Sequence, residues 1–218
     1  DVSLGIFNTK FVNNQSIDGG CINIVDKTGG FLYLNRIEAE NNTVVKNGGF
    51  LYYKSGTVII NNSQFKNNSA RSGGVIHAAH RDGTTKTLKI NSSIFINNSS
   101  EMGGVIYHYA KFNDKLIEIK DSKFLNNTAT SFAGVIFIRI SGGVGYFNAN
   151  LINNIFFTNI SGNTGGVMYS NAASHYHHIR FTDNLFINNQ SQTNSSALNL
   201  SGKKINLSLT DISKLQVE

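Results

Sequence analysis

Residues 90–106 read INSSIFINNSSEMGGVI, and this stretch contains the pattern that decides the fold. Phe95 is followed three residues later by Asn98, and a Gly-Gly pair at 103–104 then precedes an apolar strand. Polar and apolar residues alternate with a period of two, and each segment of about five residues is bounded by Asn, Ser or Gly. The stretch therefore predicts short β-strands joined by tight turns, and no amphipathic helix.

The same pattern recurs along nearly the whole chain, at intervals of 26 to 32 residues. Its Phe positions are Phe11, Phe65, Phe95, Phe124, Phe156 and Phe186, and its Asn positions are Asn14, Asn42, Asn68, Asn98, Asn127, Asn159 and Asn189. Ala39 replaces Phe in the second copy, and the small pair weakens to Ser196-Ala197 in the last. An internal repeat of this length indicates a solenoid.

Short strands repeated at this period, with no helix between them, leave one architecture. A leucine-rich repeat has a Leu-rich consensus and a shorter period, and a propeller blade needs four strands and about 40 residues. We therefore predict an all-β, single-stranded right-handed parallel β-helix of about seven turns, with three strands per turn. Residues 1–218 form one domain, and because repeats begin and break off at its ends we expect uncapped ends and a fragment of a longer solenoid.

Stacking of equivalent residues assigns a role to each position. The Phe residues should form an aromatic column in the core. The Asn residues should form a hydrogen-bonded ladder at a corner, where Asn also tolerates left-handed backbone. The Gly-Gly pair should supply positive φ and close backbone approach at another corner.

Phe-x-x-Asn followed by Gly-Gly-small-(Ile/Leu/Val) resembles the repeat of chlamydial polymorphic membrane proteins and of large surface proteins of other bacteria and protists. The resemblance extends from about Ile6 to Leu200, with Val or Phe where that family has Ala after Gly-Gly. It implies a β-helix and a surface-exposed segment, and its motif residues are structural.

Composition and charge limit the classes of partner and site that this chain could have. Net charge is +6, but the Lys and Arg residues are scattered, which argues against nucleic acid as a partner and is compatible with anionic glycans. The single cysteine excludes a disulfide framework, no apolar run is long enough to span a membrane, and we expect no cofactor and no metal site.

Asn-x-Ser/Thr sequons are frequent, as expected for an N-glycosylated protein but also for any Asn- and Ser-rich repeat. The candidates for glycosylation are Asn41, Asn61, Asn67, Asn91, Asn97 and Asn126. Asn41, Asn67, Asn97 and Asn126 precede ladder residues and should face outward, whereas sequons within the ladder should be buried. Neighbouring glycans would crowd one another, so we expect partial occupancy in a eukaryotic host.

Other candidate sites lie in longer segments that follow the Gly-Gly strands. Insertions at one repeat position emerge on one side of a solenoid. The candidate ligand-facing residues there are Arg81, Lys86, Lys111, Arg139, Tyr146, His175 and Tyr176. A column of Tyr52, His77, Tyr107, Phe137 and Tyr169, if it faces outward, could stack on sugars or pack against a neighbour.

The sequence favours a non-catalytic structural or adhesive segment of a large cell-surface or extracellular protein. Its partners would be protein or glycan surfaces, or further copies of the solenoid. Two alternatives stay open. A carbohydrate-active, pectate-lyase-like enzyme would need clustered carboxylates, and the 13 acidic residues are spread widely. A filament subunit would assemble through its bare ends.

Overall fold

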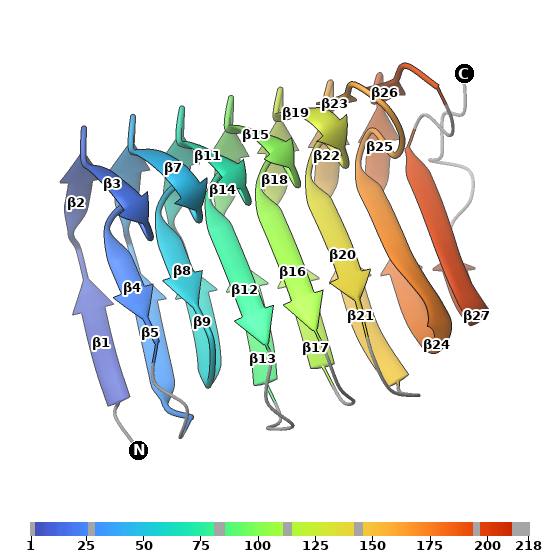
Figure 1. The fold of residues 1–218 in the computed structure, drawn as a ribbon, viewed down its shortest axis with the longest axis horizontal. Helices are drawn as coiled ribbons and strands as arrows, with labels where there is room; N and C mark the ends of the chain where they lie inside the picture. Colours follow the sequence, from blue (N-terminus) through green and yellow to red (C-terminus); the bar gives the residue numbers. More distant parts are fainter. Residues whose placement is uncertain are drawn as a thin grey trace.

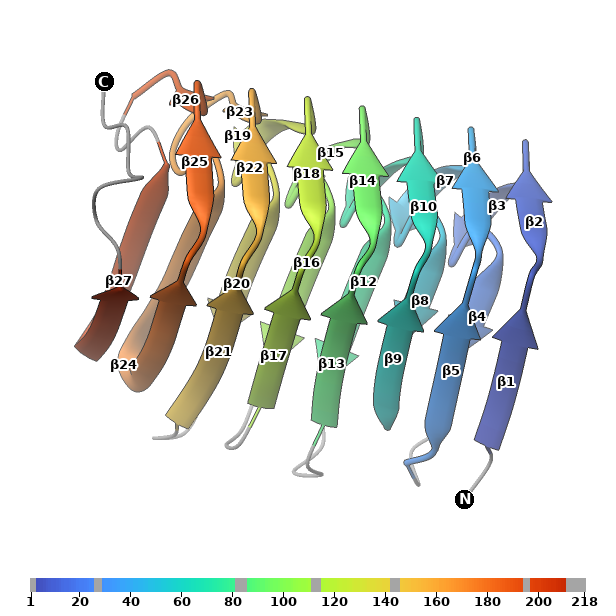
Figure 2. The same ribbon diagram turned by 180° about the vertical axis from the view of Figure 1, so that it is seen from behind.

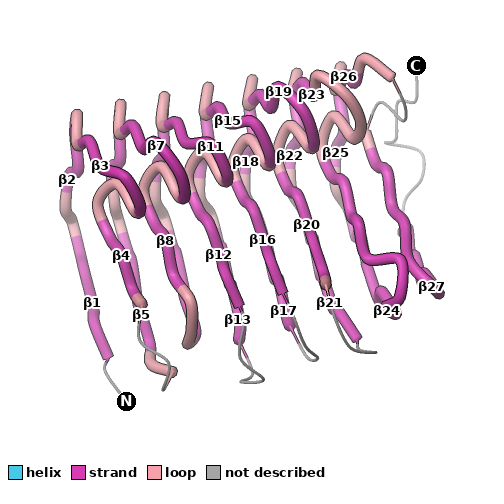
Figure 3. The backbone as a smooth tube through the Cα atoms, in the orientation of Figure 1, coloured by secondary structure: helices cyan, strands magenta, loops and turns pink. Residues whose placement is uncertain are grey.

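The computed structural model describes residues 3–25, 29–80, 86–110, 115–141, 146–193 and 197–210. These residues form a β-solenoid in which parallel strands stack turn upon turn, as predicted (Figure 1). In Figure 1 the chain advances from left to right. It rises on the far side of the rod, crosses over the top toward the viewer and descends on the near side, which makes the coil right-handed (Figures 1 and 2). The described residues include no helix, and so none that could cross a membrane (Figure 3).

Each turn contains four strands, so the expectation of three was wrong. The second and third sheets each have seven strands, and the first and fourth are joined through the long strand β24. The additional strand arises because the residues before the Phe anchor and those after the Gly-Gly pair form separate ladders on either side of the variable loop. At the usual interstrand distance, the six steps between seven strands span about 29 Å.

The first sheet supplies two columns of apolar residues, mostly aliphatic, to the core. One of them runs from Ile6 through Ile90 to Phe181, five positions before each anchor. Its strands are β1 (Ser3–Phe7), β5 (Phe31–Asn35), β9 (Thr57–Asn61), β13 (Lys86–Asn91), β17 (Lys115–Lys120), β21 (Tyr146–Ile152) and the second half of β24 (Met168–Thr182).

The second sheet has the Phe anchors at the centres of its three-residue strands. Phe65, Phe95, Phe124, Phe156 and Phe186 stack in the core at centroid distances of 4.8 to 5.0 Å. Its strands are β2 (Lys10–Val12), β6 (Glu38–Glu40), β10 (Gln64–Lys66), β14 (Ile94–Ile96), β18 (Lys123–Leu125), β22 (Ile155–Phe157) and β25 (Leu185–Ile187).

The third sheet turns small residues inward, among them Ala70, Ser100, Ala129 and Ser161. Small side chains let this sheet lie close to the core. Its strands are β3 (Gln15–Asp18), β7 (Thr43–Asn47), β11 (Ser69–Ser72), β15 (Ser99–Met102), β19 (Thr128–Phe132), β23 (Ile160–Ser161) and β26 (Gln190–Ser191).

The fourth sheet follows the Gly-Gly corner, and its side chains alternate between the core and the outer side of the sheet. Ile76 and Ala78 are buried in the core, and His77 between them points outward. Its strands are β4 (Ile22–Ile24), β8 (Leu51–Tyr53), β12 (Ile76–His80), β16 (Ile106–Ala110), β20 (Ile136–Ile140) and the first half of β24, against which β27 (Leu198–Thr210) pairs.

The asparagine ladder runs through the corner between the second and third sheets. Each inner residue repeats the contacts of Asn98, whose Nδ2 donates to Phe65 O at 3.0 Å and to Asn127 Oδ1 at 3.0 Å. Its Oδ1 accepts from the backbone N–H of Asn68 at 2.9 Å and from Asn68 Nδ2 at 3.1 Å. The ladder thus satisfies the backbone groups of a buried corner.

The left-handed residues at this corner are not the ladder asparagines, contrary to expectation. Positive φ occurs one position earlier, as in Asn67 (54°), Asn97 (53°) and Asn126 (54°). The left-handed residue turns its side chain to solvent, and the next side chain points inward. Left-handed backbone and ladder hydrogen bonds are therefore supplied by neighbouring residues.

A second polar ladder, not predicted from the sequence, lines the corner between the first and second sheets. Its members occur two positions before each anchor and are Ser63, Ser93, Ser122, Asn154 and Asn184, all buried. Each side-chain oxygen accepts from the backbone N–H of the preceding turn, as Ser93 Oγ does from Ser63 at 3.2 Å. The sequence pattern that could have predicted this ladder is the recurring Ser or Asn two residues before Phe.

The Gly-Gly corner behaves as predicted. The first glycine has positive φ, for example 67° at Gly73, and a Cβ on the second, Gly74, would lie 2.2 Å from Gly104 O. Ala133 is the exception at the first position, with φ of 58°.

Phe50 fills the gap that Ala39 leaves in the aromatic column. Ala39 pairs in register with Phe11 and Phe65, so the column lacks one ring. Phe50, at the position that is Val in the following turns, lies 5.3 Å from the Phe11 ring and 5.1 Å from the Phe65 ring. A Phe at the Gly-Gly corner thus takes the place of the Phe that the second sheet lacks in this turn.

This exchange predicts strong coupling between the two positions. Phe50→Ala should cost about 3–5 kcal/mol through the cavity it leaves. Ala39→Phe alone should cost about 1–3 kcal/mol through overpacking. The double variant Ala39→Phe/Phe50→Val should recover most of the parent stability in urea unfolding, and additive losses would contradict the exchange.

Candidate functional site

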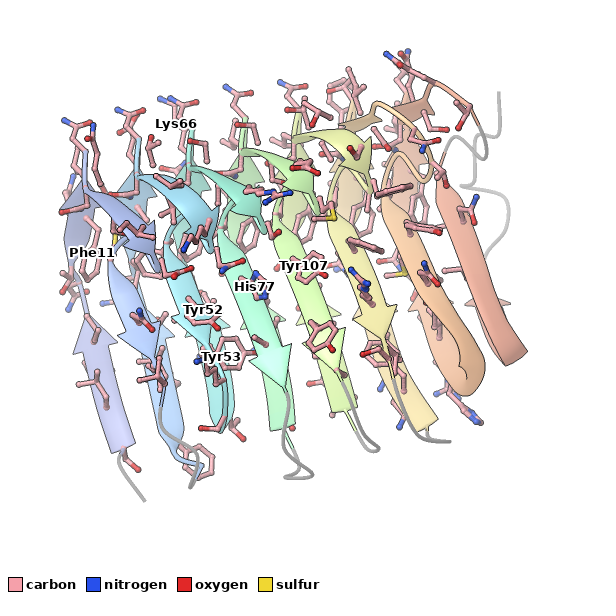
Figure 4. The ribbon with its side chains drawn as sticks, viewed as in Figure 1. Phe11, Tyr52, Tyr53, Lys66, His77 and Tyr107 are labelled. Carbon is pink, nitrogen blue, oxygen red and sulfur yellow. The ribbon has the colours of Figure 1, made fainter. Side chains whose placement is uncertain are left out.

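The best candidate site is a row of rings on the outer side of the fourth sheet. Tyr52, His77, Tyr107, Phe137 and Tyr169 occupy one register position on successive strands. Their centroids are 5.3, 4.6, 5.2 and 5.2 Å apart in that order. Tyr52, His77 and Tyr107 lie on neighbouring strands in Figure 4. We call these five residues, together with Lys54, Tyr109, Phe132 and Arg139, the aromatic face.

The aromatic face has a hydrophobic cluster that is separate from the core. Tyr107, Ala133 and Phe137 are buried in it, and Met102, Tyr109, Phe132 and Tyr169 pack against them. The Ala133 methyl group is buried here, which offers a reason for Ala at a corner where other turns have Gly. Tyr52, Tyr109, Phe132 and Tyr169 are half-buried and accessible to a ligand.

Two cations lie in the second outward column of this sheet. Lys54 Nζ lies 5.7 Å from the centroid of the Tyr52 ring, a cation–π contact. Arg139 is exposed and hydrogen-bonds the Tyr107 side chain. Burial raises the pKa of the Tyr107 hydroxyl, and this bond to Arg139 opposes the shift. The described outward residues of the fourth sheet include no carboxylate, so their charge is positive.

The structure describes few of the loop residues predicted to face a ligand. Arg81 and Lys111 lie outside the described residues, and for Lys86, Tyr146, His175 and Tyr176 it describes only the strand backbone. Arg139 alone has a described side chain, on the aromatic face. The strands that flank the insertions, β12–β13, β16–β17 and β20–β21, meet at one edge of the rod (Figure 1).

The six sequon asparagines occupy two rows. Asn41, Asn67, Asn97 and Asn126 are exposed, and Asn67 Nδ2 donates to Asn41 Oδ1 at 3.1 Å. Asn61 and Asn91 are only half-exposed, and Asn91 Nδ2 donates to Asn61 Oδ1 at 2.8 Å. A glycan on Asn67 or Asn91 would be attached to the Nδ2 atom that makes one of these bonds. The exposed Asn41, Asn97 and Asn126 are therefore the better glycosylation sites.

The described carboxylates lie apart, and most have surface partners. Among the described residues, Lys10 pairs with Glu38 (2.5 Å), Lys66 with Glu40 (3.1 Å) and Arg71 with Glu101 (2.9 Å). Glu118 pairs with both Lys120 (3.3 Å) and Lys89 (3.8 Å). Asp121 accepts from Asn153 at 2.7 Å. Among the described residues no three His, Cys, Asp or Glu side chains gather in a metal-binding arrangement.

Cys21, the single cysteine, lies at the inner side of the first Gly-Gly corner. Burial raises the pKa of its thiol to about 12, and the Asn14 amide that donates to Sγ at 3.6 Å opposes the shift. The thiol therefore stays protonated at neutral pH and is a poor nucleophile.

The outer face of the second sheet changes character along the rod, a change not predicted from the sequence. In β2, β6 and β10 it has mainly charged and polar residues, whereas β14, β22 and β25 have apolar residues on both sides of the anchor. Phe157 is 38% exposed, and Ile160, the first residue of β23 in the third sheet, is 41% exposed. The signal was a run of three apolar residues, such as Ile94-Phe95-Ile96, that breaks the alternation.

Comparison with known proteins adds no relative: no family model, no curated protein and no solved structure matches this chain.

Proposed function

We propose that this chain is a non-catalytic, adhesive β-solenoid segment of a large cell-surface or extracellular protein. The single observation that carries the proposal is the aromatic face. Its hydrophobic cluster is separate from the core. The core and the two polar ladders already stabilise the turns that this cluster spans, so the fold does not account for the cluster. Half-buried aromatic residues around such a cluster are typical of binding surfaces.

The rod suits such a role because it presents one surface on a rigid support. Parallel strands and continuous ladders connect each turn to the next, so side chains on successive turns keep a constant spacing. The resemblance to repeats of large surface proteins and the exposed sequon row support a location outside the cell. The dispersed, mostly paired carboxylates favour this proposal over a carbohydrate-active enzyme.

Removal of accessible rings should therefore weaken adhesion. We expect Tyr52→Ser/Tyr169→Ser to reduce binding of rod-coated beads to cultured cells and extracellular matrix about tenfold or more, because each ring contributes roughly 0.5–1.5 kcal/mol beyond its buried area. Phe157→Ser, on the second sheet, is the matched control and should bind like the parent. Equal binding by both variants, or cleavage of a polysaccharide by the parent chain, would refute the proposal.

A further inference from the structure

We propose that the aromatic face binds a linear, negatively charged polysaccharide that lies along the axis of the rod. This inference rests on the proposed adhesive function and names the chemistry of its partner. It follows from three properties of the aromatic face: the linear order of its rings, its polar groups and its charge.

The rings form a straight platform. Tyr52, His77, Tyr107, Phe137 and Tyr169 occupy one register column, so the line from first to last runs parallel to the rod. Four steps at the interstrand distance make it about 19 Å long, enough for several sugar rings in succession. Tyr52 and Tyr169 at the ends of the row are half-buried, whereas the three rings between them are only 3 to 7% exposed. An extended chain lying across the row therefore contacts mainly the two end rings.

Polar groups beside the rings match the hydroxyl groups of a sugar. Tyr109 OH and Ser141 Oγ, 2.6 Å apart, lie in the half-buried rim of the face. Asn171 continues the second outward column and is exposed, and Asn199 continues the ring column and is half-buried. Apolar surfaces alternating with hydroxyl and amide groups suit a carbohydrate better than a purely apolar peptide segment.

The charge selects an acidic polymer. Lys54 and Arg139 lie in the same column three turns apart, on either side of the half-buried Tyr109. The described carboxylates lie on the other sheets and corners, including Glu38 and Glu40 on the second sheet. The Arg fork binds carboxylate or sulfate groups in bidentate geometry, and Lys54 supplies a second positive charge.

The same features disfavour nucleic acid. Binding that depends on a phosphate backbone requires many cations along the groove. The described part of this face has two, and Phe137 and Tyr169 stack on each other at 14°, which leaves no gap for a base between them.

The test compares polymers and charge-matched variants. We would measure affinities of the whole chain for polygalacturonate, heparin, neutral dextran and a single-stranded DNA oligonucleotide. The parent should bind polygalacturonate or heparin at least tenfold more tightly than dextran or DNA. Polygalacturonate carries only carboxylate groups, so binding to it shows that carboxylate suffices, and binding to heparin alone shows that sulfate is required. Lys54→Gln/Arg139→Gln should weaken that binding at least tenfold.

The control is Lys46→Gln/Lys123→Gln, which removes two exposed charges from the third and second sheets and should change affinity less than twofold. Equal losses in both double variants, no acidic polysaccharide binding, or DNA binding as tight as polysaccharide binding would overturn the inference. Adhesion to proteins without polysaccharide binding would overturn it and leave the adhesive function standing. Shortening of the polysaccharide would instead refute the adhesive function.

Discussion

Asn98→Ala should lower the free energy of unfolding by about 3–9 kcal/mol, because three buried groups lose their hydrogen-bond partner at about 1–3 kcal/mol each. These groups are the backbone N–H of Asn68, one Nδ2 hydrogen of Asn68 and the carbonyl oxygen of Phe65. Water cannot replace the lost amide, since Asn68 and Asn98 have no exposed surface. Urea unfolding followed by circular dichroism measures the loss.

The neighbouring position provides the control. Asn97 is exposed and has φ of 53°, so Asn97→Gly preserves the left-handed corner and removes only a surface side chain. Its effect should stay within about 0.5 kcal/mol, as for most surface substitutions. A similar small effect of Asn98→Ala would show that the ladder contributes little to the stability of the rod.

Gly74→Ala should have an effect of similar or larger size, for a steric reason. The new Cβ would lie 2.2 Å from Gly104 O and 2.7 Å from Ser99 O, and both oxygens belong to the backbone of the next turn. Neither atom can move without breaking the interstrand pairing on both sides of the corner. We expect a loss above about 3 kcal/mol, beyond the range of ordinary overpacking, or failure to fold.

Gly29→Ala separates this close approach from the backbone preference of glycine. Gly29 has φ of 84°, and a Cβ added there would have no atom of the described residues within 4 Å. This substitution should cost only about 1–2 kcal/mol for the left-handed conformation. Should thermal unfolding show the same loss for Gly29→Ala and Gly74→Ala, contact between turns would not be the reason for the second glycine.

The columns of the solenoid could be predicted because they depend only on the repeat. Once Phe95 is aligned with Phe124, the positions around the anchor are aligned as well, and the stacking of Asn98 on Asn127 follows. Face assignment within a strand also follows, since alternation places Ile76 inside and His77 outside.

Features that depend on the shape of one turn could not be predicted in this way. The repeat shows where a corner lies, but the backbone path decides whether Asn97 or Asn98 is left-handed. The four-strand turn likewise depends on which residues on either side of the variable loop pair with the next turn. The exchange of Phe50 for Ala39 joins a residue of the Gly-Gly corner to one of the second sheet, and no spacing in the sequence connects them.

The candidate site shows the same division. Sequence periodicity alone places the rings of Tyr52, His77, Tyr107, Phe137 and Tyr169 in one column, because each follows its Gly-Gly pair by the same number of residues. Only the folded chain brings Phe132 and Met102 around the corner to that column and sets Lys54 over Tyr52. A repeat specifies neighbours along the rod through its period, whereas neighbours around the rod depend on corner geometry and side-chain packing.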